Sequence, residues 1–170
     1  MSTGAMHARA HRSGGFTLVE MMIVISLVAI IMAIAVPSFR DASLGSQLRA
    51  TANELVASAM LARSEAIKRN APVTMCVSTS GTACTAGSWE QGWIVIQGGT
   101  VIQRQHEGAT GFKVSSGINT LNFQPIGAGA TPATFTVCRA TPSVGGQKRI
   151  VTITFTGRAS VASQTGTTCP

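Results

Sequence analysis

Two features near the N-terminus could act together chemically: a glycine–phenylalanine bond and a carboxylate in an apolar stretch. The run from Phe16 to Val36 has 21 residues, of which only three are polar, Glu20 among them. A carboxylate at the centre of a bilayer costs about 2.5–3.5 kcal/mol, and less near its surface, so Glu20 needs a cation. Cleavage between Gly15 and Phe16 would place a new α-amino group four residues before Glu20, on the same helix face or on a copy packed alongside. With such a cut, the carboxylate of Glu20 would have a cation to pair with.

The same run is long enough to cross a membrane. As a helix it would extend about 32 Å, at about 1.5 Å per residue, and a bilayer core is about 30 Å thick. Arg9 and Arg12 precede it, and basic residues favour the cytoplasmic side. We therefore expect one transmembrane helix over residues 16–36, with the rest of the chain across the membrane.

The stretch Gly15-Phe16-Thr17-Leu18-Val19-Glu20 resembles the prepilin processing site of the type IV pilin superfamily. The resemblance implies that residues 1–15 are a leader, that prepilin peptidase cuts between Gly15 and Phe16, and that Phe16 is then N-methylated. It also implies that Glu20 neutralises a neighbour's N-terminus during assembly. The expected partners are other major and minor pilins, in the inner membrane before assembly and in a filament afterwards.

Two other interpretations of the N-terminus remain. Arg9 and Arg12 before an apolar core, with Ala33-Ile34-Ala35 after it, also fit a secretory signal that is cut near Val36. Such a core would be interrupted by Glu20, and a helical pattern continues beyond Ala35. The second alternative is a plain single-span anchor.

Four cysteines follow the apolar run, in the part expected to face an oxidising compartment. Such a compartment favours disulfides over a metal site, and no pair has a zinc-like spacing with histidine. Three pairings are possible. We favour one that closes a short loop and one that ties down the C-terminal tail, each contributing about 2–4 kcal/mol. The expected disulfides are Cys76–Cys84 and Cys138–Cys169.

Catalytic chemistry is not expected. His106, beside Glu107, is the one histidine left after the leader, and no Ser-centred or Cys-centred motif accompanies it. A glycine-rich phosphate loop is also missing from the sequence. We therefore predict a protein that is not an enzyme and has no cofactor. For Trp89 and Trp93, core packing of at least one is favoured over base stacking.

The charge is unevenly distributed. The formal net charge is +7, and loss of Arg9 and Arg12 with the leader lowers it to +5. Residues 108–170 have no acidic side chain, so this half favours an anionic partner. Its five cations are Lys113, Arg139, Lys148, Arg149 and Arg158.

Beyond the apolar run, the pattern predicts more helix and then strands. Pro37 should kink the helix without ending it, and an apolar stripe continues over residues 37–70 until Asn70-Ala71-Pro72. From Val73 onward, β-branched residues and glycines predict strands over residues 71–170, and the order of elements predicts an α+β fold. The stripe is Leu44, Leu48, Ala52, Leu55, Ala59, Ala62 and Ala66. The expected strands are 73–78, 93–97, 101–106, 120–124, 134–139, 149–155 and 158–162, and the expected exposed loops are 127–132 and 142–146.

Within the pilin superfamily the chain is most similar to the GspH and FimT branch, in which a long helix precedes an all-β domain. The landmarks are residues 61–69, Trp89-Glu90-Gln91-Gly92-Trp93 and Phe155-Thr156-Gly157-Arg158-Ala159. The resemblance implies a minor pilin that acts in assembly or at the tip of a type IV pilus. The alternative is a GspH-type pseudopilin of type II secretion.

Some FimT-type pilins bind DNA for natural transformation through a Gly-Arg-any-Arg element. The matching residues here are Gly157-Arg158-Ala159-Ser160, without the second arginine. We hypothesise that Lys148, Arg149 and Arg158 lie along one edge and bind DNA phosphates without reading sequence. Lys148, Arg149 and Arg139 would compensate for the missing second arginine. The alternative is a solvated basic face or a contact with other subunits. The four hypothesised residues are Arg139, Lys148, Arg149 and Arg158.

Overall fold

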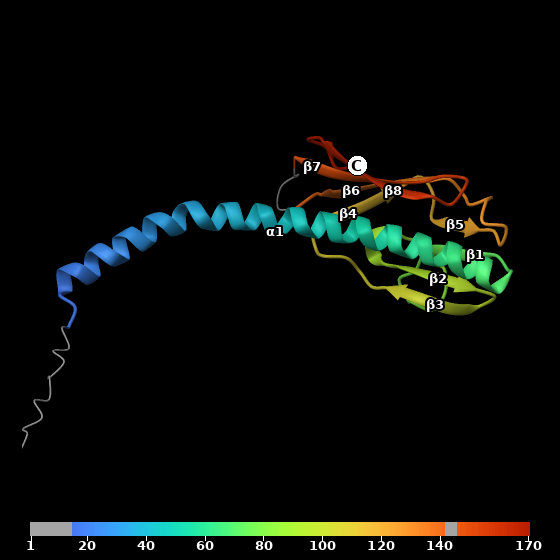
Figure 1. Cartoon of the computed structure of the whole chain (residues 1–170), viewed down its shortest axis with the longest axis horizontal. Coiled ribbons are helices and arrows are strands. Elements are labelled where there is room, and N and C mark those ends of the chain that lie inside the picture. The colour runs from blue at the N-terminus through green and yellow to red at the C-terminus, as the bar shows by residue number, and fades with distance from the viewer. Residues whose placement is uncertain (1–14, 142–145) are drawn as a thin grey trace, which may run out of the picture. The chain divides into compact units, whose positions relative to one another are not determined.

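The structure is a computed structural model that describes residues 15–141 and 146–170 (Figure 1). At residues 37, 38, 40 and 41 it describes the backbone alone. The expected leader, apart from Gly15, and most of the expected loop 142–146 lie outside the described residues. The chain divides between Asp41 and Ala42 into two units, which we describe separately.

Helix α1 runs from Leu18 to Arg69 and passes through Pro37 without ending, as expected. Its first part, in the N-terminal unit, contains one segment apolar enough to cross a membrane, Leu18–Val36, with a mean hydropathy of 2.8. None of that segment is buried within the structure. The transmembrane length expected from the sequence is therefore available as a continuous exposed helix.

The C-terminal end of α1 is fixed by its backbone. Asn70 adopts a left-handed φ of 49°, and its N–H donates to the carbonyl of Ile67 (3.2 Å). The N–H of Ala71 donates to the carbonyl of Ala66 (3.2 Å). These two bonds form a Schellman motif, which satisfies carbonyls at the end of the helix. The stop expected at Asn70-Ala71-Pro72 is confirmed.

The strands form two antiparallel sheets. Sheet A has the order β3-β2-β1-β5, and sheet B has the order β4-β6-β7-β8. The strand expected at 149–155 lies inside sheet B as β7, between β6 and β8. Their bounds are Val73–Val77 (β1), Trp93–Gln97 (β2), Thr100–Gln105 (β3), Phe112–Ser116 (β4), Thr120–Phe123 (β5), Ala133–Arg139 (β6), Gln147–Ile153 (β7) and Ala159–Thr165 (β8), and a 3-10 helix, η1, covers Trp89–Gln91.

Strand β4 was not expected from the sequence. It alternates buried and more exposed residues, with Phe112 and Val114 buried and Lys113 exposed. Glycines flank this five-residue segment at both ends. Pairing with β6 along its whole length makes it a strand.

The core lies between α1 and the two sheets. In the view of Figure 1, β2 and β3 lie below the second half of α1, and β6 and β7 lie above it. The predicted helical stripe is confirmed: Leu44 packs against the core, and the other six residues are buried in it. The small alanines of this stripe let the helix backbone lie close to both sheets. The α+β fold expected from the sequence is therefore confirmed, with two sheets contacting the helix.

Both disulfides expected from the sequence are present. Cys76–Cys84 joins β1 to the loop that follows it, and Cys138–Cys169 joins β6 to the C-terminal tail. Cys76 and Cys138 are fully buried, so each bridge attaches a surface segment to a strand of the core.

Candidate functional site

The helix that carries Glu20 begins at a capping residue. The hydroxyl of Thr17 accepts a hydrogen bond from the N–H of Glu20 (3.2 Å), and the carbonyl of Thr17 accepts from Met21 (3.1 Å). Thr17 is therefore the N-cap, and Glu20 is the third residue of the helix, where the helix dipole favours a negative charge. Phe16 is 76% exposed and precedes the cap.

This start modifies the geometry expected for Glu20. The sequence predicts a helix from about Phe16, whereas in the uncut chain the helix begins at Leu18 and Phe16 lies before it. The pairing of Glu20 with the amine of the cleaved chain stays a prediction. Among the described residues the ion pairs are the two made by Glu65. Glu20 is exposed.

Arg63 connects the end of α1 to two turns of the β-domain. Its Nε and Nη2 donate to the carbonyl of Gly127, at 3.2 and 3.0 Å. Gly157, with φ +70°, lies so close that a Cβ there would be 2.9 Å from Cδ of Arg63. Two of the landmark stretches, residues 61–69 and 155–159, therefore meet in space. Their contact through Arg63 was not predicted from the sequence.

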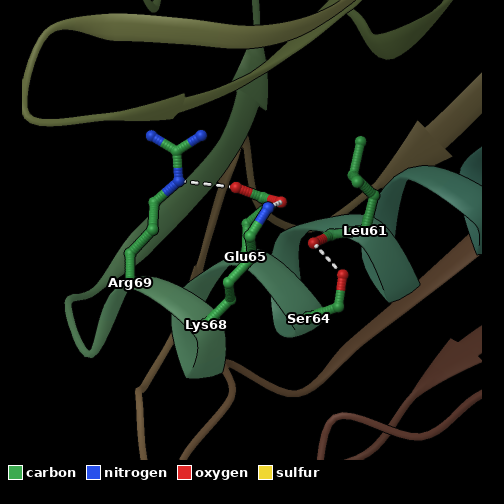
Figure 2. A network of polar contacts seen from close by, with 5 residues as sticks. All are labelled: Leu61, Ser64, Glu65, Lys68 and Arg69. Carbon is green, nitrogen blue, oxygen red and sulfur yellow. Dashed lines mark hydrogen bonds and ion pairs between the residues drawn. The ribbon is translucent and has the colours of Figure 1, made fainter.

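A network of charged residues lies next to Arg63 on α1. Figure 2 shows Lys68 and Arg69 reaching the carboxylate of Glu65, at 3.5 and 2.5 Å, and Ser64 donating to the carbonyl of Leu61. The hydrogen bond from Arg69, aided by the charges of Arg69 and Lys68, lowers the pKa of Glu65 below its usual value of 4.5 despite partial burial. The side chain of Lys68 remains 76% exposed in its ion pair with Glu65, in the last turn of the helix.

The cations expected to bind DNA do not form one cluster. Lys148 and Arg149 are neighbours on β7, so their side chains point to opposite faces of sheet B. Arg149 shares its face with Val137, its partner on β6, and is 8% exposed. Its guanidinium donates to Ser163 Oγ (2.5 Å), to the carbonyl of Lys148 and to Gln147 Oε1. Arg149 is therefore a buried, hydrogen-bonded residue rather than a surface cation.

The other expected cations are also spread apart. Lys148 Nζ donates to Thr168 Oγ1 (3.3 Å) in the C-terminal tail, and Arg139, partly buried, pairs with Phe112 across β6 and β4. Arg158 is exposed in the turn after β7, where its carbonyl accepts from Thr154 (3.0 Å). Thr154, to which Arg158 is bonded, is six residues after Lys148, and six residues of strand extend about 20 Å. Arg158 and Lys148 are therefore at opposite ends of β7. The expectation that Lys148, Arg149 and Arg158 lie along one edge is wrong. The length of β7 separates Lys148 from Arg158, and the pleat places Lys148 and Arg149 on opposite faces of the sheet.

Both tryptophans are in the core, as expected for at least one. Trp93 Nε1 donates to Ser58 Oγ (3.0 Å), and Trp89 Nε1 donates to the carbonyl of Ile118 (2.7 Å). Trp89 also packs edge-on against Phe135, with the ring centroids 4.9 Å apart. Their exposed fractions are 1% and 2%, so neither ring offers a face to a nucleic-acid base. His106 is exposed at the end of β3.

A family model for the type II transport protein GspH matches residues 51–157. The chain belongs to the GspH family. A model of the prokaryotic N-terminal methylation motif matches residues 10–36. The GspH match begins within α1 and ends at Gly157, so it contains both turns that contact Arg63. A search of curated proteins found no match.

Solved structures with a similar fold are minor pilins and a pseudopilin. Two crystal forms of the type IV minor pilin FimU of Pseudomonas aeruginosa strain PAO1 align over 71% and 67% of this chain and 91% of theirs. Their identities are 21% and 22%, and their TM-scores are 0.53 and 0.50. The minor pseudopilin EpsH of the Vibrio cholerae type 2 secretion system aligns over 69% of this chain and 97% of its own, at 12% identity and a TM-score of 0.48. The likeness to FimU shows a shared fold.

Together the two family matches identify a minor pilin or pseudopilin of the type IV pilus and type II secretion superfamily. Such proteins are structural components without catalytic activity. The methylation motif and the exposed apolar helix fit a single-pass inner-membrane protein that is later assembled with other pilins.

Proposed function

We propose that this GspH-family chain is a minor pilin of a type IV pilus that contributes to pilus assembly or to the tip complex. Prepilin peptidase cuts between Gly15 and Phe16, and Phe16 is then N-methylated. The observation that carries the proposal is the match of the methylation motif over residues 10–36, which includes the exposed apolar segment Leu18–Val36 and precedes the GspH match over residues 51–157. N-terminal sequencing of the membrane-extracted protein should start at N-methyl-phenylalanine 16. A start at Val36 would refute the processing step.

Glu20 is the proposed assembly contact. Its carboxylate is exposed in the segment Leu18–Val36, which is otherwise almost entirely apolar, so burial of Glu20 among neighbouring helices would be costly without a cation. The α-amine of Phe16 on a neighbouring subunit supplies one. Glu20→Gln keeps the size of the side chain and removes the charge, so we expect normal membrane insertion and processing but strongly reduced assembly.

The matched control is Ser26→Ala, in the same apolar segment. Ser26 Oγ donates to the carbonyl of Met22 (2.8 Å), so its polarity is already satisfied within the helix. Filaments should be sheared, collected and blotted for this subunit from both variants. Equal incorporation of the Glu20→Gln and wild-type subunits would remove the proposed role of Glu20.

The proposed topology places the unit Ala42–Pro170 in the periplasm, with the leader in the cytoplasm. Its two disulfides support an oxidising compartment. Protease added to spheroplasts should digest this unit while leaving cytoplasmic markers intact. Protection of the unit from protease would contradict the topology.

The alternative is a GspH-type pseudopilin of a type II secretion system. The same leader, helix and domain would serve either machine. Deletion of the gene separates the two: loss of surface pili with normal secretion supports the pilus, whereas retention of secreted enzymes in the periplasm with normal pili supports type II secretion. Complementation by the wild-type chain is the control for either outcome.

We propose a second, narrower function: sequence-independent DNA binding. Residues 108–170 have no acidic side chain, and Arg158 is exposed beside the turn of Gly157. Because Arg149 is buried, the contact would rest on Arg158 and Lys148. Gel shifts of the domain at several salt concentrations give the slope of the log of the DNA association constant against the log of the salt concentration. Arg158→Ala should reduce the magnitude of this slope by about 0.9, the value for one phosphate contact. Arg104→Ala, an exposed arginine on β3 of the other sheet, should leave the slope unchanged, and no binding near 50 mM salt would eliminate this function.

A further inference from the structure

The two sheets have four edge strands: β3 and β5 in sheet A, and β4 and β8 in sheet B. An edge strand presents N–H and C=O groups that can pair with another chain unless something covers them or disturbs their regular geometry. Three of the four edge strands, β3, β4 and β5, are protected in this way, each by a different feature.

At β5 the loop after the strand covers the edge. The N–H of Asn122 donates to Thr131 Oγ1 (3.1 Å), and the carbonyl of Asn122 accepts from the N–H of Thr131 (3.0 Å). At β4 a side chain covers the edge, since the N–H of Val114 donates to the carboxylate of Glu90 (3.3 Å). Both backbone groups of Asn122 and the N–H of Val114 are therefore satisfied from outside the sheet.

At β3 the edge is irregular and charged. The register between β3 and β2 shifts at Val95/Ile96, and a bulge of this kind twists an edge away from flat pairing. The strand also carries the exposed Arg104. Both features discourage the addition of another strand.

Strand β8 has none of these protections among the described residues. It pairs with β7 over all seven residues, Ala159 to Thr165, without a register shift. It contains no charged residue and no proline, and six of its residues are exposed. The side chain of Val161 is 39% exposed, while its partner Val151 on β7 is fully buried. The last strand of sheet B therefore extends beyond the core.

The hydrogen bonds at the two ends of β8 show which of its backbone groups point outward. The N–H of Thr154 donates to the carbonyl of Arg158 (3.0 Å), and the N–H of Gly166 donates to the carbonyl of Gly146 (3.2 Å). In an antiparallel pair, hydrogen-bonded positions alternate with non-bonded ones. Positions 160, 162 and 164 therefore bond to β7. The N–H and C=O groups of Ala159, Val161, Ser163 and Thr165 face away from it.

We propose that the outer edge of β8 is a docking site for an extended, acidic segment of another protein, which adds to sheet B as a further strand. Main-chain bonds to the outward groups would supply affinity, and an apolar side chain would cover Val161. The sign of the charge follows from the surroundings: Arg158 is exposed directly before β8, Lys148 of β7 pairs with Gln164 of β8, and residues 108–170 have no carboxylate side chain. The segment would extend from Arg158 at one end of the strand toward Lys148 at the other.

Charge also argues against a second copy as the occupant. The β8 strand of another copy is uncharged, is preceded by the same Arg158 and lies beside the same Lys148 of β7. Pairing β8 with β8 would therefore bring like charges together. The proposal does not depend on whether the chain serves a pilus or a secretion machine.

The test uses the full chain in detergent and a short fluorescent peptide that alternates valine and glutamate. A matched peptide that alternates valine and lysine is the charge control. Fluorescence anisotropy should show binding of the acidic peptide alone. Hydrogen exchange of the segment 159–165 should slow when this peptide is added.

Val161→Pro removes an outward N–H and leaves the bonds to β7 intact, a placement that edge strands tolerate. We expect this substitution to weaken binding of the acidic peptide roughly tenfold, the effect of about one lost hydrogen bond. Ser160→Ala, whose N–H faces β7, should bind as the wild type does. Thr165→Pro removes another outward donor and keeps the test valid if Val161→Pro fails to fold.

Four results would overturn the proposal. They are unchanged affinity in both folded proline variants, equal binding of the lysine peptide, slow exchange of segment 159–165 through self-association without peptide, and protection of that segment by duplex DNA in place of the acidic peptide.

Discussion

Gly157 offers a sharp test of how the end of α1 is attached to the β-domain. Its φ of +70° is left-handed, which costs an alanine about 1–2 kcal/mol. A Cβ at this position would lie 2.9 Å from Cδ and 3.2 Å from Nε of Arg63. Arg63 would have to move, which would break its bonds to the carbonyl of Gly127. A hydrogen bond from a charged donor contributes about 1.5–3 kcal/mol, so Gly157→Ala should lower the free energy of unfolding by about 2.5–5 kcal/mol.

Gly98→Ala is the matched control. Gly98 also has a positive φ, +55°, but nothing lies within 4 Å of a Cβ built there. Gly98→Ala should therefore lower the free energy of unfolding only by the cost of a left-handed backbone for alanine, about 1–2 kcal/mol. The same smaller cost is expected for Gly157→Ala when Arg63 has first been replaced by alanine, because the side chain that it displaces is then gone.

The assay is urea unfolding of the unit Ala42–Pro170, followed by tryptophan fluorescence. The buried core lies wholly within this unit, and both tryptophans are buried and report its unfolding. The four proteins of the double-mutant cycle should give a coupling of about 1.5–3 kcal/mol between Arg63 and Gly157. If Gly157→Ala costs no more than Gly98→Ala, or costs the same with and without Arg63, the attachment through Arg63 is refuted.

Three further predictions concern stability. Replacing Cys138 and Cys169 with serine should cost about 4 kcal/mol on the loop-entropy model, against about 2.5 kcal/mol for the disulfide that closes the shorter loop; parallel urea titrations measure both. Ser58→Ala leaves the indole N–H of Trp93 buried without its acceptor, so it should lower the free energy of unfolding by about 1–3 kcal/mol, whereas a neutral result would mean that the indole finds another acceptor. The pKa of Glu65 is lowered in the folded state. Its contribution to the free energy of unfolding is therefore complete above pH 4.5 and is lost as the pH falls through the pKa of the folded state. The difference in unfolding midpoint between wild type and Glu65→Gln should therefore be present at pH 7 and vanish in acid, and a difference that is independent of pH would contradict this origin.

The sequence alone predicted the local features well, because each depends on neighbouring residues. The apolar run to Val36 has the length of a membrane span whatever it contacts, and the stripe from Leu44 to Ala66 has the helical period. Asn70 before Ala71-Pro72 marked the end of the helix. The cysteine pairing followed from compartment and loop length, and the processing motif lies in six consecutive residues.

The tertiary structure decided what depends on pleat, register and the meeting of distant segments. Lys148 and Arg149 are adjacent in sequence, yet the alternation of a strand puts one on the outer face and buries the other. Arg158 is ten residues after Lys148 in sequence, and the length of β7 separates them. Only the folded chain brings Gly157 against Arg63. Likewise, a strand is an open edge only if no other segment covers it, so the availability of β8 could not be read from its seven residues.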